Sequence, residues 1–271
     1  DRLLRRGGAW VANHPKRDLI TRRYLAHDRG LQSDALERLA LLEDRPSGAD
    51  PVDEPADEDE IADVAESAVE DPISLNEQRM AAVVAEVQRG SHRSVVDLGC
   101  GEGRLLGRLL RETGAERVVG IDVSHRSLAI AARRRHLDTM APRQRDRIEL
   151  RQGGLTYVDP ALRGFDVACL VEVIEHIEPW RLDAVEHVVF AEAQPGRVVV
   201  TTPNIEHNVR FAGMDPGRLR HADHRFEWSR AEFATWCEAV ADRHGYAVTY
   251  AAIGDDDPEV GPPTQMAVFA R

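Results

Sequence analysis

The stretch VVDLGCGEGRLL, residues 95–106, decides the fold of this 271-residue chain, because it joins a buried strand to a helix through a glycine-rich turn. Glycine tolerates the positive φ values that such a turn needs, and it lets backbone pass close to a ligand. Gly99 and Gly101 begin a G-x-G-x-G spacing, tighter than the G-x-G-x-x-G of dinucleotide sites. Asp97 before the glycines and Glu102 among them would repel phosphates and attract a cation. The stretch therefore predicts a site for a ligand that carries an amino acid's ammonium group.

Beyond this stretch, short β-branched runs alternate with longer helical patterns. The candidate strands are residues 94–98, 117–121, 147–151, 165–171, 197–202, 246–252 and 265–270. Helical patterns follow each of the first five, which indicates an α/β fold with a seven-stranded, mostly parallel sheet covered by helices on both faces. The segment between the last two strands, GDDDPEVGPPT, has no helical pattern, so we expect these strands to pair as an antiparallel hairpin at one edge.

Composition divides the chain into three parts. Residues 1–42 read as basic helices, and because the chain opens without Met we expect it to be a fragment of something longer. Residues 43–71 hold thirteen acidic residues and one arginine, which matches the whole formal charge of −12 and is typical of a solvated linker. The average charge therefore does not exclude a nucleic-acid partner for the rest. A domain is predicted over 72–271, beginning with a helix whose capping box is Ser74-Leu-Asn-Glu77.

Cysteine spacing and hydropathy exclude other classes. Cys100, Cys169 and Cys237 form no C-x-x-C pair, so neither a disulfide framework nor a zinc finger is predicted, and a reducing cytoplasm is expected. No apolar run approaches the roughly 20 residues that span a bilayer, so no membrane partner is expected.

An acid stands at the end of the second predicted strand, about twenty residues past the glycines. Asp122 is at the position that accepts both ribose hydroxyls of a nucleoside; its alternative role is to cap the next helix, although Ser124 could do that. The glycine turn and Asp122 together resemble the class I S-adenosylmethionine-dependent methyltransferase fold. The resemblance implies that S-adenosylmethionine is bound by Asp97, Gly99, Gly101 and Asp122.

The stretch VEVIEHIEPW, residues 171–180, places two carboxylates and an imidazole after the fourth predicted strand. If it turns into a helix, Glu172, Glu175 and His176 converge on one side, at the carboxyl end of a strand where ligands bind in such sheets. The alternative is a solvent-facing charged turn with a helix-capping Glu.

Three further histidines fall in loops after the fifth predicted strand. His207 lies in TTPNIEHNVRF, and His221 and His224 precede a helix with a capping box at Ser229 and Glu232. Histidines facing a Glu-Glu-His group suggest a mixed oxygen and nitrogen metal site. Mn²⁺ fits this set best, with Co²⁺, Fe²⁺ and Zn²⁺ as alternatives.

Together the motifs EVIEHI, TTPNIEHN and HADHRFEW resemble the HEN-type RNA 3′-terminal ribose 2′-O-methyltransferases. That family caps small RNAs in eukaryotes, and its bacterial relatives act beside a kinase-phosphatase-ligase in RNA repair. The resemblance to the bacterial form implies that residues 1–42 are the tail of an upstream domain. The resemblance implies metal ligation by Glu172, Glu175, His176 and His224, where spacing alone cannot separate His224 from His221. It also places Gly154 and Leu155 near the adenine, although the family often has G-S-L where this chain has Gly153-Gly154-Leu155.

The function implied is metal-dependent methyl transfer from S-adenosylmethionine to the 2′-hydroxyl of an RNA 3′ end, in RNA repair. If both vicinal hydroxyls of the last nucleotide bind the metal, specificity for the end follows. His176, His221 or hydroxide could accept the proton, and the sequence does not choose among them. The alternative is a metal-dependent O-methyltransferase acting on a small vicinal diol or catechol.

Overall fold

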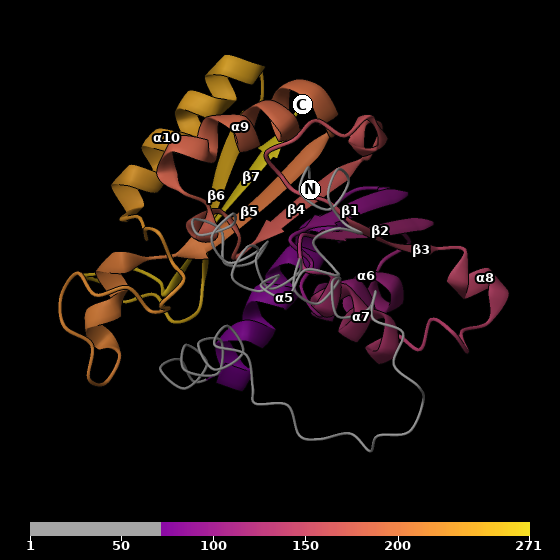
Figure 1. Cartoon of the computed structure of the whole chain (residues 1–271). Helices are drawn as coiled ribbons and strands as arrows, with labels where there is room; N and C mark the ends of the chain where they lie inside the picture. The colour runs from indigo at the N-terminus through magenta and orange to yellow at the C-terminus, as the bar shows by residue number, and fades with distance from the viewer. Residues whose placement is uncertain (1–71) are drawn as a thin grey trace, which may run out of the picture.

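A computed structural model describes residues 72–271, with side chains from Leu75 onward. These residues form a seven-stranded sheet in the order β3-β2-β1-β4-β5-β7-β6 (Figure 1). The strands are β1 Ser94–Leu98, β2 Arg117–Asp122, β3 Ile148–Gln152, β4 Val167–Val171, β5 Arg197–Pro203, β6 Ala247–Ile253 and β7 Thr264–Ala270. Every predicted strand is present, with small differences at the ends. The helical segment 1–42 and the linker 43–71 expected from the sequence lie outside the described residues.

The pairing follows from the connections. Strands β1 to β5 pair in parallel, because each crossover between them is long enough to cross a face of the sheet. The segment between β6 and β7 contains no helix, and these two strands pair antiparallel, from Ala247 opposite Ala270 to Ile253 opposite Thr264. Strand β7 also pairs antiparallel with β5. The predicted mostly parallel sheet with a terminal hairpin is therefore confirmed, and β7 lies inside the sheet while β6 forms its edge.

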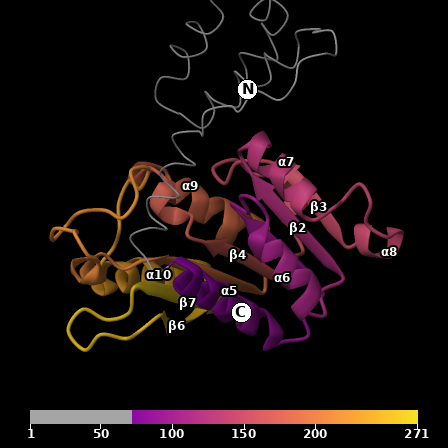
Figure 2. The same ribbon diagram turned by 90° about the horizontal axis from the view of Figure 1, so that it is seen from below.

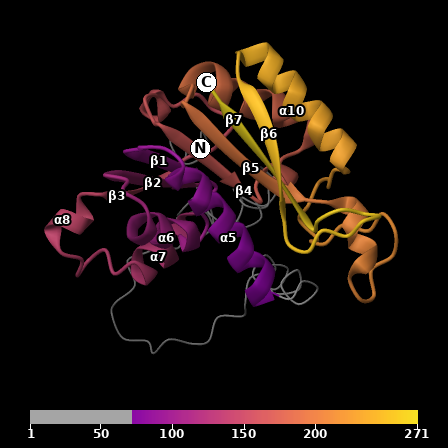
Figure 3. The ribbon, with the colours of Figure 1, turned by 180° about the vertical axis from the view of Figure 1, so that it is seen from behind.

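Helices cover both faces of the sheet. They are α5 Pro72–Gln88, α6 Arg104–Glu112, α7 His125–Arg134, α8 Pro142–Arg145, α9 Leu182–Glu186, a π-helix His187–Ala193 and α10 Arg230–His244. Viewed from behind, α5, α6 and α7 lie over one face (Figure 3). The short helix α8 lies beside β3, far from α10 (Figure 2). None of the helices within 72–271 has the length and apolar character needed to cross a membrane.

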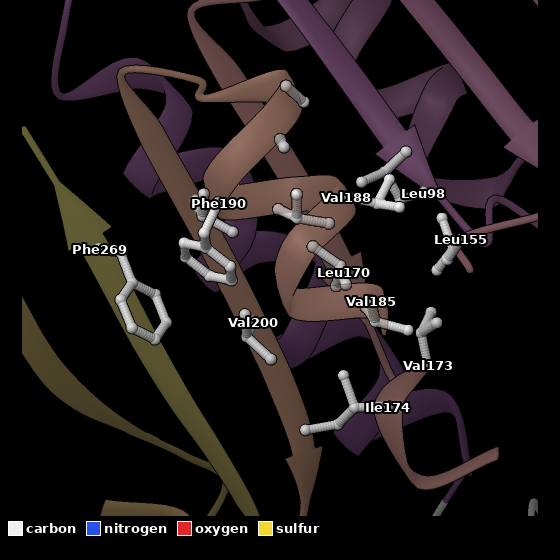
Figure 4. Close-up of a cluster of buried hydrophobic side chains, with 14 of the residues drawn as sticks. Leu98, Leu155, Leu170, Val173, Ile174, Val185, Val188, Phe190, Val200 and Phe269 are labelled. Atoms are coloured by element: carbon white, nitrogen blue, oxygen red, sulfur yellow. The ribbon is translucent and has the colours of Figure 1, made fainter. Parts of the chain in front are cut away.

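Two apolar clusters result from the alternation of side chains along the strands. Val95 packs with α5 and α6, whereas its neighbour Val96 packs with the π-helix and α10 on the other face. Figure 4 shows the second cluster, in which Leu170 and Val200 of the sheet face Val188 of the π-helix. Both faces of the central strands are thus buried, as their continuous apolar runs predict.

The sequence was misleading at three helical segments. Helix α5 begins at Pro72, so the expected N-cap Ser74 lies inside its first turn. No α-helix follows β3 before β4, only a 3₁₀ turn at Pro160–Leu162. The stretch after β4 forms a 3₁₀ turn at Ile174–His176 instead of a helix that includes Glu172.

Candidate active site

The glycine turn after β1 is shaped for a ligand. Gly99, Gly101 and Gly103 have φ values of 83°, 49° and 73°, in the left-handed region that other residues rarely adopt. A Cβ at Gly99 would lie 2.6 Å from Val173, and one at Gly103 would lie 2.9 Å from Ala131, so these two glycines also permit close packing. A Cβ at Gly101 would meet no protein atom within 4 Å. The turn is therefore packed against protein on two sides and open at Gly101.

Asp122 links this turn to the start of α7. One carboxylate oxygen accepts the Gly101 N–H at 2.8 Å, and the other accepts the Ser124 N–H at 2.8 Å. The Ser124 side chain caps α7 by accepting from the Ser127 N–H, so Ser124 takes the capping role that the sequence left open between it and Asp122. Burial raises the pKa of Asp122, although its backbone hydrogen bonds lower it. Asp122 thus holds the turn in place and lies at its open side. Each of its carboxylate oxygens can accept one more hydrogen bond, from a ligand.

Asp97 lies beneath the turn at the end of β1. Its side chain is 2% exposed, and burial together with the charge of Asp122 raises its pKa to about 7. Its Oδ2 has no hydrogen-bond partner among residues 72–271. A buried carboxyl oxygen without a donor is unfavourable unless a ligand supplies one. An ammonium group on the ligand would do so.

The loop after β3 adjoins the same mouth, because the Gly153 N–H donates to the Asp122 carbonyl at 3.0 Å. Leu155 is buried, and a Cβ at Gly154 would lie 3.6 Å from Tyr157 and 3.7 Å from Val123. Val123 and Tyr157 are themselves exposed. This apolar pair was not predicted from the sequence, although Val123 directly follows Asp122 and is an apolar residue at a strand end.

The structure changes the role given to Glu102. Its carboxylate pairs with Arg134 of α7 at 2.6 Å. The charge argument for a cationic ligand therefore depends on Asp97 and Asp122, whose carboxylates have no cationic partner within the described residues.

A second group lies after β4 and before α10. The imidazole nitrogens of His176, His221 and His224 lie within 4.8 Å of one another, and they are the set of potential metal ligands that residues 72–271 bring together. The ring centroids of His176 and His224 are 4.8 Å apart. The backbone joins the two loops, since the Arg225 N–H donates to the Glu175 carbonyl at 2.8 Å.

Hydrogen bonds fix the tautomer of His224. Its Nδ1 lies 2.6 Å from Oε1 of Glu227. The same oxygen also accepts the Arg220 N–H, and Oε2 of Glu227 accepts from the Asn208 side chain. Although burial opposes ionisation, the hydrogen bonds from His224, Asn208 and Arg220 lower the pKa of Glu227. An ionised carboxylate only accepts, so His224 donates from Nδ1 and presents the lone pair of Nε2. Burial also lowers the pKa of His224 and favours the neutral ring that binds metals.

His221 has the opposite tautomer. Its Nδ1 accepts the Asp223 N–H at 2.9 Å, so in a neutral ring the proton is on Nε2. His221 therefore presents a donor where His224 presents a lone pair. This difference separates the two histidines, which sequence spacing could not do.

The two glutamates stand beside this histidine group but outside it. Glu172 has a φ of 54°, uncommon for a residue with a side chain, and its Oε1 accepts from the Thr201 hydroxyl while its Oε2 lies 3.3 Å from Arg79. Glu175 is completely buried, and its Oε2 accepts from the Thr202 hydroxyl at 3.1 Å. Of the four predicted ligands, His176 and His224 are brought together, and the carboxylates are held on threonines of β5.

His207 has a structural role. It is buried, its Nδ1 lies 2.7 Å from the Gly261 carbonyl, and its ring packs against Phe211. The expectation that it belongs to the histidine group is wrong, because the turn after β5 directs it toward the β6–β7 connection. Arg220, which was not predicted as a structural residue, is buried nearby and donates to Asn208, to the Asn204 carbonyl and to the Pro263 carbonyl.

Comparisons with known proteins agree with this geometry. A family model described as "Methyltransferase domain" matches residues 24–248, and one described as "RNA repair, ligase-Pnkp-associating, region of Hen1" matches residues 1–40. The small RNA 2′-O-methyltransferase of Gallus gallus is 34% identical over 209 residues, covering 73% of this chain and 54% of that protein. That of Arabidopsis thaliana is 30% identical over 213 residues, covering 73% and 22%. The chain spans about half the length, or less, of these relatives.

A solved structure matches over its whole length. The crystal structure of the methyltransferase domain of bacterial CtHen1 is 43% identical, with a TM-score of 0.68, and the match covers 73% of this chain and all of that one. The crystal structure of the small RNA methyltransferase HEN1 is 30% identical, with a TM-score of 0.64, covering 73% and 25%. The fold is that of class I S-adenosylmethionine-dependent methyltransferases, and the chain belongs to the HEN-type family of RNA 2′-O-methyltransferases.

Proposed function

We propose that this chain transfers a methyl group from S-adenosylmethionine to the 2′-hydroxyl of the 3′-terminal ribose of RNA, and that the reaction depends on a divalent metal. The observation that supports this most directly is that a methyltransferase fold brings His176, His221 and His224 together after β4 and before α10, with the tautomer of His224 fixed by Glu227. We propose RNA as the substrate because the similar proteins of Gallus gallus and Arabidopsis thaliana are small RNA 2′-O-methyltransferases.

The residues around the turn fit S-adenosylmethionine. The Asp97 oxygen without a donor suits the ammonium of the methionine part, and Asp122 suits the ribose hydroxyls. Val123, Leu155 and Tyr157 offer apolar surface for the adenine. Held in this way, the sulfonium methyl can be presented to an attacking oxygen in line, and such alignment contributes much of the rate.

The residues around the histidines fit a divalent ion. His176 and His224 would supply imidazole nitrogens, and Glu172 and Glu175 become oxygen donors if they exchange their threonine hydroxyls for the ion. Mn²⁺ is the ion we propose, since it accepts both donor types. When bound, the ion supplies Lewis acidity that lowers the pKa of a hydroxyl by several units.

The tautomers narrow the choice of proton acceptor. A neutral His221 ring carries its proton on Nε2, so it can donate a hydrogen bond to the RNA end but cannot accept a proton at that atom. Of the three acceptors that the sequence left open, hydroxide is the one we propose while the ion is bound, because His176 directs its Nδ1 toward Asp223 and would give its Nε2 to the ion. His176 faces Asp223 with its Nδ1, 3.5 Å from the carboxylate, which keeps the ring oriented.

The test compares RNA ends at saturating Mn²⁺. A short RNA with both terminal hydroxyls should be methylated, a 2′-deoxy end should not react, and a 3′-phosphorylated end should react poorly. A 3′-deoxy end keeps the reacting oxygen but offers the ion one hydroxyl instead of two, so it should react far more slowly without weaker RNA binding.

Two outcomes would change the proposal. Equal rates for 3′-hydroxyl and 3′-deoxy ends would refute chelation and leave RNA methylation standing. Methylation of catechol or a free diol with no transfer to RNA would instead assign a small-molecule O-methyltransferase. Omitting Mn²⁺ in each reaction shows whether the metal is required.

We also propose that residues 1–42 dock onto an RNA-repair ligase partner and that 43–71 are a linker. The match of 1–40 to a ligase-associating region supports the first point. Co-purification of a repair ligase with the whole chain, but not with a chain that lacks residues 1–42, tests it.

A further inference from the structure

A cavity of about 390 Å³ lies away from the candidate active site. It is bounded by the carboxyl-terminal parts of α6 and α7, by α8 and by the residues before β3. The lining begins one turn along α6 from the glycine turn, since the Gly107 N–H donates to the Gly103 carbonyl at 3.3 Å, and it includes none of the residues assigned to the candidate active site. Its lining residues are Gly107, Leu110, Arg111, Arg134, Arg135, His136, Met140, Gln144 and Arg147.

The four arginines of the lining are not equivalent. Arg134 pairs with Glu102, and Arg147 donates to the carbonyls of Leu110 and Ala115, where it complements the end of α6. These two side chains therefore have partners within the protein, and helix termini explain their position.

Arg135 and Arg111 are different. The Nε of Arg135 is buried and makes no hydrogen bond to the described residues. Arg111 has one long contact, 3.9 Å to Glu112, whose carboxylate is already held by Arg108. Burial, Arg111 and Arg134 together lower the pKa of Arg135. Two guanidinium groups, of which that of Arg111 is largely exposed, therefore line one cavity with little compensating charge, and an anion that enters it would supply the acceptor that the buried Nε of Arg135 lacks.

Gly107 of α6 makes this arrangement possible. A Cβ at Gly107 would lie 1.7 Å from Nη1 of Arg135 and 3.2 Å from Nη1 of Arg111. The two guanidinium groups thus converge over one glycine, at a position where helix propensity alone would favour another residue. The convergence of two planar forks suits the oxygens of phosphate.

We propose that this cavity binds a phosphate-bearing ligand, with Arg135 and Arg111 as the groups that contact the phosphates. Its volume exceeds that of one phosphate and lies at the lower end of the range of small-molecule sites. A diffusible nucleotide and the backbone of an RNA strand share this chemistry. The proposal does not depend on the reaction proposed above.

The first arm of the test uses the whole chain and inorganic pyrophosphate or ATP, with binding measured by calorimetry. Arg135→Gln should weaken binding at least tenfold. Gly107→Ala keeps every charge and favours the helix, but its methyl group displaces the Arg135 guanidinium, so it should also weaken binding. Arg133→Gln removes the same charge from an exposed position of α7 outside the cavity and should change binding less than twofold.

The second arm measures the affinity of RNAs of 4 and 20 nucleotides as salt is raised. If RNA phosphates occupy the cavity, the longer RNA binds more tightly, and Arg135→Gln removes that gain and lowers the salt slope by about one. If a free nucleotide occupies it, ATP binds without competing with RNA. The proposal would be overturned if pyrophosphate, ATP and long RNA all bind the wild type and the variants with equal affinity. It would also be overturned if none of these ligands binds. Gly107→Ala provides the comparison if Arg135→Gln does not fold.

Discussion

At the scale of single residues, Asp97 makes stability depend on pH. Its pKa is raised from 3.8 to about 7, so the folded protein binds this proton more tightly than the unfolded chain does. The proton's contribution is fully present below pH 3.8 and is lost as the pH rises through 7, when the buried carboxylate ionises at a cost of up to about 4 kcal/mol.

Asp97→Asn should therefore raise the unfolding free energy of the cofactor-free protein at pH 8, and this gain should shrink toward pH 4. Urea unfolding at both pH values measures it, with exposed Asp138→Asn as the control. The same variant should bind S-adenosylmethionine at least tenfold more weakly. A gain that is equal at pH 8 and pH 4 would show that protonation of Asp97 is not its cause.

Two kinds of alanine variant should have reciprocal effects. Glu175→Ala or His176→Ala should abolish methyl transfer and leave S-adenosylmethionine binding within about twofold, because both residues lie on the histidine side of the site. Asp122→Ala should weaken cofactor binding at least tenfold and leave Mn²⁺ binding intact. Exposed His187→Ala is the control. Calorimetry with each ligand separates the effects; near-normal turnover by Glu175→Ala at low Mn²⁺ would contradict the metal proposal.

The sequence located these residues but not all of their contacts. Asp97, the glycines and Asp122 follow from strand ends and spacing, because parallel strands place their carboxyl ends along one edge of the sheet. Which of His221 and His224 presents a lone pair depends on Glu227 and on the backbone N–H of Asp223. That His207 lies outside the histidine group depends on its contact with the Gly261 carbonyl. Such contacts join distant segments, so spacing could not reveal them.

At the scale of elements, the capping box of α10 is the clearest local signal. Ser229 accepts the Glu232 N–H, and the Glu232 side chain accepts the Ser229 N–H, as the sequence predicts. Ser229→Ala should lower the unfolding free energy by about 1 kcal/mol. Thr235→Ala, at an exposed position inside the same helix, should change it by less than half as much. Urea unfolding of the two variants measures both values, and equal effects would show that the cap itself contributes little.

The helical elements after β3 and β4 show where periodicity fails. Apolar spacing cannot distinguish a 3₁₀ turn such as Ile174–His176, or the π-helix His187–Ala193, from an α-helix over so few residues. The left-handed Glu172 arises because its N–H is held by Thr201 of the neighbouring strand, a tertiary contact.

At the scale of the whole molecule, the proposed domain boundary can be tested by shortening the chain. The acidic segment before Pro72 opposes RNA and is too polar to form a core. A chain that begins at Pro72 should therefore keep full methyl transfer to a short RNA. Initial rates of the long and short chains measure this, with circular dichroism to show folding; a folded short chain without transfer would place the boundary elsewhere.

The position of β7 has a consequence for biosynthesis. This strand follows β6 in sequence, yet it lies between β5 and β6. At ribosomal rates of 5–20 residues per second, the edge of β5 stays unpaired for about 3–12 s after it emerges, whereas β6, which ten residues separate from β7, has no neighbour for about 0.5–2 s. Thr264 and Gln265, which form hydrogen bonds with Arg79 and with the Trp228 carbonyl, are synthesised together at the start of β7. The nascent chain thus exposes two unpaired strand edges, which can pair with other chains, until β7 is synthesised and completes the sheet. We expect the chain to need chaperones most during this interval.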